Sequence, residues 1–138
     1  MEMNGFDVEQ PDDVCDHDGL DENDARAHFN GKYRSQIDYT NTLLTEDLMW
    51  MNHQAFKYYL PGYLSASLDD DDGEIASRVL SALASHVSGP KEDRIRFTEA
   101  ELKTINRWLD AVLNQFGEND VWGFKQRIAK YRAKLEMI

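Results

Sequence analysis

The chain has 138 residues, enough for one domain with a single buried core, and 41% of them are hydrophobic. It contains no apolar run of the roughly 18 residues that indicate a membrane-spanning helix, and its first residues have neither the basic nor the apolar region of a secretory signal peptide. Its single cysteine, Cys15, cannot form an internal disulfide, so we expect a cytoplasmic protein.

The net charge of -11 is concentrated at the start of the chain. Residues 1–25 carry ten acids and no Lys or Arg, whereas residues 26–138 carry sixteen acids and fifteen bases. Residues 1–20, the acidic leader, have few large apolar side chains to offset the entropy lost on ordering. We therefore predict a mobile or loosely packed leader and a single helical domain over residues 21–138. The leader either keeps the protein in solution or docks a basic partner.

The first helix is predicted over residues 22–30, with Asp21 as its N-cap and Gly31 as its stop. Residues 32–45 combine β-branched and aromatic side chains without a clean period. They are either a connector or a short extended segment. Thr45 is then predicted to cap a turn over EDLMWM.

The stretch AFKYYLPGYLSASL, residues 55–68, follows a predicted cap at Asn52. Its apolar side chains recur at spacings of three and four residues, which is typical of one buried helix face. Pro61 interrupts this face, so either the helix kinks there or a second helix begins. Tyr58 lies off the face and is predicted to be exposed. The predicted core consists of Phe56, Tyr59, Leu60, Leu64, Leu109, Val112 and Phe116.

Four aspartates, residues 69–72, raise the question of a calcium site. A calcium loop needs oxygen ligands at its first and twelfth positions around a glycine at the sixth. Counting from Gly73 places Leu68 and Val79 at those positions, and neither side chain can serve. The aspartates instead suit the N-terminal end of the next helix, where they supply a cap and favourable charge.

Three more helices are predicted over about 73–87, 98–117 and 120–136. The second has a capping box, with Thr98 as N-cap and Glu101 three residues later. Gly117 ends it, and Asp120 is the predicted cap of the last helix. Helices joined by short connections predict an all-α, bundle-like domain of five or six helices.

The sequence contains no established catalytic or metal-binding motif. The four histidines lie singly, without the three- or four-residue spacing of a helical metal site, and no phosphate loop or nucleophile motif is present. Cys15 and His17, with neighbouring aspartates, could hold a metal, but they lie in the leader. We expect no cofactor and no metal ion.

The last helix carries five cations over residues 125–134 and no acid between positions 121 and 135. Cations near a helix C-terminus complement its dipole, and this is the favoured interpretation. The acidic leader folding back over this helix is the alternative. A chain with a pI near 4.6 is too acidic to favour nucleic-acid binding, and we expect no membrane partner either.

Three segments resemble a bacterial family of small proteins classed as a domain of unknown function. They are HFNGKYR at 28–34, LMWMNHQAFKYYLPGYLSASL at 48–68 and RFTEAELKTINRWLDAV at 96–112. The specific part is the Ala-Phe-x-Tyr-Tyr-Leu-Pro-x-Tyr-Leu pattern. The resemblance implies a compact, mainly helical domain and brings no activity or catalytic residue.

Acidity, small size and absent catalytic motifs favour a binding protein, for example an immunity-type inhibitor of a toxin or other enzyme. The alternative is an enzyme whose carboxylates and tyrosines converge only in the fold. The expected partner is another protein, for example a basic one, and no oligomeric state is predicted. The predicted partner-binding residues are Asp12, Asp13, Asp16, Asp18, Tyr58, Asp70 and Asp71.

Overall fold

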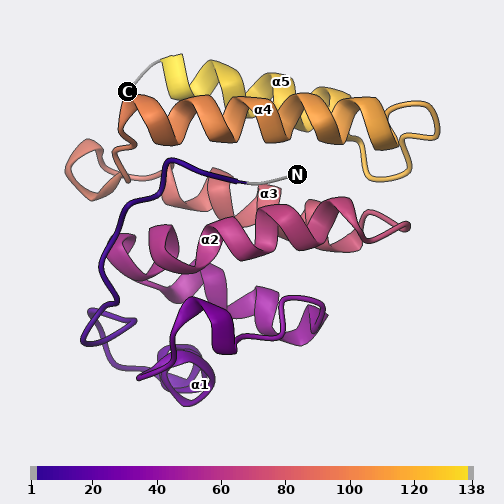
Figure 1. Ribbon diagram of the computed structural model, residues 1–138. Helices are drawn as coiled ribbons and strands as arrows, with labels where there is room; N and C mark the ends of the chain where they lie inside the picture. Colours follow the sequence, from indigo (N-terminus) through magenta and orange to yellow (C-terminus); the bar gives the residue numbers. More distant parts are fainter. Residues whose placement is uncertain (1–2, 137–138) are drawn as a thin grey trace.

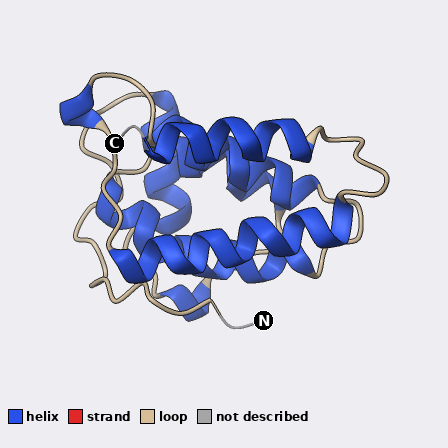
Figure 2. Ribbon diagram, turned by 90° about the horizontal axis from the view of Figure 1, so that it is seen from above, coloured by secondary structure: helices blue, strands red, loops and turns tan. Residues whose placement is uncertain are grey.

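A computed structural model describes residues 3–136, and every regular element among them is helical (Figures 1 and 2). The predicted all-α class is therefore confirmed. The α-helices are α1 (Leu20–Phe29), α2 (His53–Leu68), α3 (Glu74–His86), α4 (Glu99–Phe116) and α5 (Phe124–Glu136). The short 3-10 helices are η1 (Arg34–Gln36), η2 (Thr42–Trp50) and η3 (Lys91–Asp93).

The helices form three tiers (Figure 1). The antiparallel pair α2 and α3 makes the middle tier, α4 and α5 cover one side of it, and α1 with η1 and η2 covers the other. The middle tier contacts both outer tiers, so its helices are surrounded on two sides by protein. This position explains why the aromatic stretch of α2 is apolar around most of its circumference.

The core sits between these tiers. Of the seven predicted core residues, six are fully buried, and Phe116 is partly buried against them.

Tyr58, predicted to be exposed, is also buried at 6% exposure. Its ring packs edge-on against Tyr59 and lies under the guanidinium of Arg34, which approaches its centroid at 4.4 Å. The tier that contains η1 therefore covers a second side of α2. A helix with only one buried face would leave that side in solvent.

Local capping chemistry sets several helix starts as predicted. The Asn52 side chain accepts a hydrogen bond from Ala55 N at 2.8 Å. Thr98 and Glu101 form the reciprocal capping box at the start of α4. Asp120 accepts hydrogen bonds from the first two backbone N–H groups of α5. These bonds satisfy donors that the first helical turn leaves without partners.

Other local predictions were wrong. Helix α1 begins at Leu20 after an uncapped Gly19, and Asp21 lies within its first turn. Asn41, not Thr45, caps η2, and Thr45 is buried inside it. Val121, which lies within the predicted last helix over about 120–136, is outside α5 and 82% exposed, because α5 begins only at Phe124. Each error concerns where a loop ends, which depends on tertiary packing more than on propensity.

Helix α2 runs through Pro61 without a break, so a single helix carries both halves of the aromatic stretch. The next residue, Gly62, lies directly against the ring of Tyr39. A Cβ atom at Gly62 would stand 2.1 Å from the Tyr39 ring, which no side chain could tolerate. The tyrosine ring also packs edge-on against Tyr63. The Pro-Gly pair therefore allows the connector to approach α2 closely.

The described part of the leader is packed against the helices, contrary to the expected loose packing. Its side chains Met3, Phe6, Val14 and Cys15 are buried in the common core. Thr104 of α4 donates a hydrogen bond to Asn4 O. At Gly5 the leader passes so close to α4 that an added Cβ would lie 2.8 Å from Ala100 O.

Two arginines fix the leader through its backbone. Arg34 donates to Phe6 O at 2.8 Å, to Val8 O and to Tyr58 O. Arg26 donates to Cys15 O and His17 O and forms 2.9 Å ion pairs with Asp13 and Asp18. The amino-acid composition of the leader did not predict that it is packed, because the two arginines bind mainly its backbone carbonyls, and a composition records only side chains.

The cations of α5 do not pair with the leader. Arg127 donates to Ser77 and Ser81 of α3, and Lys134 donates to Ser88. Arg132 forms a 2.7 Å ion pair with Asp110 of α4. The contacts of α5 thus attach it to α3 and α4, and the proposed folding of the leader over this helix is not observed among the described residues.

Candidate functional site

Four elements meet at the amino end of α2 and enclose an open hollow of about 720 Å³. We call it the Trp50 groove. Its lining includes Asp16 from the leader, Trp50 from η2, His53 from α2, and Glu92 and Asp93 from η3. A second hollow of about 300 Å³ adjoins it, shares Trp50 and His53, and extends to Met49 and His86. The two hollows form one continuous depression.

The apolar end of η2 places two large side chains at this groove. Leu48 points into the core and is fully buried, whereas the next residues, Met49 and Trp50, are 46% and 43% exposed. Met51 is buried again. An exposed tryptophan beside an exposed methionine is uncommon on a surface without a binding role, because both residue types are enriched at protein interfaces.

The groove carries negative charge that no cation in the described residues neutralises. Asp16, Glu92 and Asp93 are exposed, and none of them forms an ion pair with a described Lys or Arg. Asp16 accepts only a 3.3 Å hydrogen bond from the Asn52 side chain. By contrast, Asp13 is held by Arg26, and the hydrogen bond to that guanidinium lowers the pKa of the Asp13 carboxyl.

Three histidines line the depression, and burial favours the neutral ring in two of them, His53 and His86. Burial lowers the pKa of His86 to about 4, and burial also lowers the pKa of His53. The His86 ring stacks on Phe56 at 4.0 Å between centroids, and its Nε2 lies 2.8 Å from Leu48 O. A neutral His53 adds no positive charge, so the carboxylates set the electrostatic potential of the groove.

The predicted partner-binding aspartates have different environments. Asp12, Asp13, Asp16 and Asp18 are all exposed on the leader, but only Asp16 lines the groove. Asp13 and Asp18 are occupied by Arg26.

The remaining predicted site residues do not join the groove. Tyr58 is buried in the core. Asp70 is half-buried and accepts a hydrogen bond from Ile75 N, and Asp71 is exposed beside it. Both aspartates follow the carboxyl end of α2, a helix of 16 residues and therefore about 24 Å long, whereas the groove lies at its amino end. The structure does not bring the two acidic clusters together.

Sequence reasoning missed Trp50, His53, Glu92 and Asp93 as site residues. Met49-Trp50-Met51 belongs to a segment predicted only as a turn, and residues 91–93 lie between two predicted helices. One signal was available. Three successive large apolar residues in a short segment cannot all face inward, so at least one had to remain exposed.

Three tyrosine hydroxyls and the single thiol lie inside the protein. Tyr59, Tyr63 and Tyr131 are fully buried, and burial raises the pKa of each hydroxyl. Burial raises the pKa of the Asp47 carboxyl, which pairs with His28 at 2.5 Å. Cys15 is buried, which raises its thiol pKa to about 11 and removes thiolate character.

The described residues contain no cluster of three or more His, Cys, Asp or Glu side chains suited to a metal ion. Within the same part of the chain, the helices all lack the combined length and apolarity needed to traverse a membrane.

No family model, no curated protein and no solved structure matches this chain. The resemblance to a bacterial domain of unknown function therefore stays a prediction.

Proposed function

We propose that this protein binds a basic protein partner through the Trp50 groove, in the manner of an immunity-type inhibitor. One observation carries the proposal: Met49 and Trp50 are exposed beside a hollow with three carboxylates that lack described ion-pair partners. A central aromatic anchor surrounded by charge complementary to the partner is the usual composition of an energetically important contact.

The charge distribution supports a basic partner. Residues 1–50 carry thirteen acids and three bases, a net charge of -10. A surface of this kind attracts a basic protein over distances of about a Debye length, 8–10 Å at moderate salt, and raises the rate of encounter. The apolar contact of Trp50 would then slow dissociation, because it removes water from the centre of the interface.

Affinity capture from the native host tests the proposal. The wild-type protein and Trp50→Ala serve as baits, and quantitative mass spectrometry compares what each retains. We expect a basic protein to be enriched on the wild type and lost from the variant, since truncating a central tryptophan costs about 2 kcal/mol or more of binding free energy. Val121→Ala is the matched control, because this exposed apolar residue lies outside the groove.

Neutralising carboxylates of the groove tests whether their charge acts on the association rate, as distinct from the apolar contact of Trp50, which acts on dissociation. Asp16→Asn with Asp93→Asn should lower the association rate at low salt and leave dissociation nearly unchanged. Asp69→Asn with Asp71→Asn is the control, because it removes the same amount of charge at the other end of α2, outside the groove. Deletion of residues 1–20 would be a poor substitute, because it also removes buried side chains, among them Met3, Phe6, Val14 and Cys15. Retention of the same proteins by the wild type and by Trp50→Ala would contradict the proposal.

A further inference from the structure

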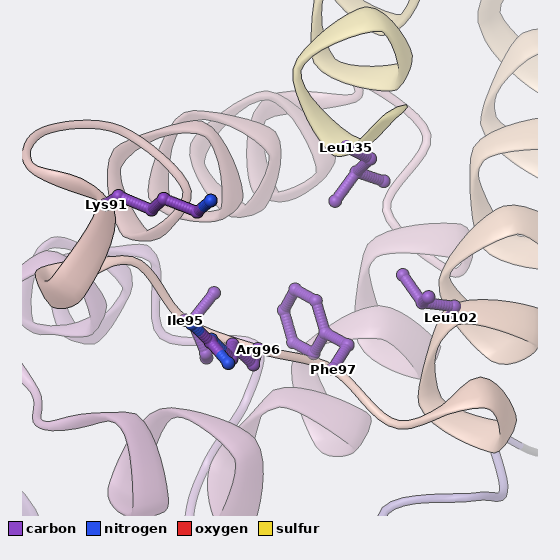
Figure 3. A pocket seen from close by; sticks show the side chains of 6 residues that line it. All are labelled: Lys91, Ile95, Arg96, Phe97, Leu102 and Leu135. Atoms are coloured by element: carbon purple, nitrogen blue, oxygen red, sulfur yellow. The ribbon is translucent and has the colours of Figure 1, made fainter. Parts of the chain in front are cut away.

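A separate pocket lies where α4 begins and α5 ends (Figure 3). Its volume is about 400 Å³, within the range of about 300–1,000 Å³ that is typical of small-molecule sites. Four apolar side chains line it: Ile95, Phe97, Leu102 and Leu135. Figure 3 shows the Phe97 ring below Leu135 and beside Leu102, with the Lys91 side chain extending toward the same space from η3.

The extended segment after η3 builds one wall of this pocket. Ile95 is fully buried and donates its backbone N–H to His86 O at 2.8 Å, which holds the segment against α3. Its neighbour Arg96 therefore projects to the surface, and Phe97 returns toward the core and is only partly buried. This alternation places an apolar wall and a cation side by side.

Lys91 and Arg96 are the only charged side chains in the lining, and neither makes an ion pair or side-chain hydrogen bond with a described residue. The nearby Lys57 differs, because it forms a 2.8 Å ion pair with the buried Glu101 while lying over the Phe97 ring. The pocket thus combines an apolar interior with two cations that have no counter-ion in the described chain.

The wider charge pattern also favours an anion here. Residues 88–138 carry eight acids and ten bases, a net charge of +2, although the whole chain is at -11. The tier of α1, η1 and η2, residues 20–50, carries six acids and three bases and lies on the other side of α2 and α3 (Figure 1). Screening over about 8–10 Å reduces the repulsion that this tier exerts on an anion at the pocket.

We propose that this pocket binds a free long-chain alkyl carboxylate, with the alkyl chain against the four apolar side chains and the carboxylate at Lys91 and Arg96. A cationic amphiphile would bring like charge to the two bases, and a neutral one would leave them without a partner. The proposal does not depend on the Trp50 groove, which differs in lining and in charge.

Isothermal titration calorimetry of the full chain with dodecanoate, below the concentration of micelle formation, tests this site. We expect saturable binding of one molecule per chain. Across octanoate, decanoate and dodecanoate, the affinity should rise by about threefold to fourfold for each added methylene that is buried. Dodecyltrimethylammonium, with the same alkyl chain and opposite charge, should bind at least tenfold more weakly.

Two variants locate the site. Lys91→Glu with Arg96→Glu should reduce the dodecanoate affinity at least tenfold. Lys103→Glu with Arg107→Glu makes the same charge change on exposed positions of α4 outside the pocket lining and should leave the affinity within about twofold. Leu135→Asp places a carboxylate in the lining and should abolish binding, with circular dichroism confirming that the helices remain.

Three results would overturn the proposal. Non-saturable uptake would indicate general association of a detergent with the surface. Equal binding of dodecanoate and dodecyltrimethylammonium would remove the role of the two cations. Equal losses in the two double variants, with the fold retained, would place the carboxylate elsewhere and show that only the overall charge matters.

Discussion

The N-terminal segment, residues 3–50, and the remaining described chain, residues 51–136, are held in place by different interactions. The second segment contributes 23 of the 30 buried apolar residues, and the first contributes seven. The N-terminal segment has fewer buried apolar residues and is held in place by polar contacts as well. Arg26 and Arg34 together bind five backbone carbonyls, and His28 pairs with Asp47 across α1 and η2.

This difference indicates how an acidic, weakly apolar segment becomes ordered. A guanidinium has several donors in a fixed plane, so one arginine can connect carbonyls from parts of the chain that are far apart in sequence. Charged hydrogen bonds of this kind contribute about 1.5–3 kcal/mol each where they are shielded from water.

The apolar segment should respond most to loss of a core side chain. Leu109 of α4 is fully buried between α2 and α5, and Leu109→Ala should lower the free energy of unfolding by about 2–5 kcal/mol. Urea denaturation measures this loss. Asn114→Ala, at an exposed position of the same helix, should change it by less than about 0.5 kcal/mol. A loss below that value at Leu109 would mean that the apolar contacts are not the main support of this segment.

Acid should weaken the junction between the two segments. His86 of α3 is buried against Leu48 of η2, and its pKa is lowered from 6.5 to about 4. Because the unfolded chain takes up this proton more readily, the stability that the neutral ring supplies is present above pH 6.5 and is lost as the pH falls to 4. The loss is about 3 kcal/mol.

Urea titrations between pH 7 and pH 4 measure this loss. The difference in stability between the wild type and His86→Gln should change by about 3 kcal/mol over that range. His17→Gln, at an exposed leader histidine, is the control substitution. Parallel pH profiles for the wild type and His86→Gln would disprove the assignment to His86.

Arg34→Lys isolates the polar support of the N-terminal segment. Lysine keeps the charge but cannot reach Phe6 O, Val8 O and Tyr58 O together, so we expect a loss of about 2 kcal/mol. Hydrogen exchange should accelerate at the leader more than in α4. Arg107→Lys, an exposed arginine with no described side-chain contact, is the control. Uniform acceleration throughout the chain would mean that the two segments do not differ in their support.

The smallest effect is expected at the turn between α2 and α3. Asp70 accepts the Ile75 N–H at 3.1 Å, so Asp70→Ala should cost about 1 kcal/mol, the usual value of a helix cap. Asp71→Ala, next to it and exposed, should cost less than half as much. Thermal denaturation followed by circular dichroism resolves the two. Equal effects would show that the charge near α3, rather than the cap itself, supports this turn.

Local sequence signals predicted a helix well where the residues that define the helix lie close together in the sequence. The capping box at Thr98 and Glu101 and the periodic face ending at Phe116 define α4 almost completely. The same reasoning failed for the leader, because a backbone carbonyl has no side-chain signature and Arg34 lies 28 residues from the Phe6 carbonyl that it binds.

The candidate site was largely beyond sequence reasoning. Asp16 was predicted as a partner-binding residue, but its neighbours in the groove come from positions 50, 53, 92 and 93. No periodic pattern relates these positions, because the leader, η2, α2 and η3 converge only through tertiary packing. Tyr58 shows the opposite error, since a residue outside one helix stripe was buried by a third element.

The separation of charge between the tiers gives the molecule a polarity that its net charge conceals. Residues 20–50, which form the tier of α1, have a net charge of -3, and residues 88–138, which include α4 and α5, have a net charge of +2; the two tiers lie on opposite sides of α2 and α3 (Figure 1). On a positively charged chromatographic matrix or sensor chip, the acidic side would therefore face the support and the basic side would face the solvent. Adsorption in that orientation would cover the Trp50 groove, whereas a covalent linkage through the exposed lysines of α5 would leave it accessible.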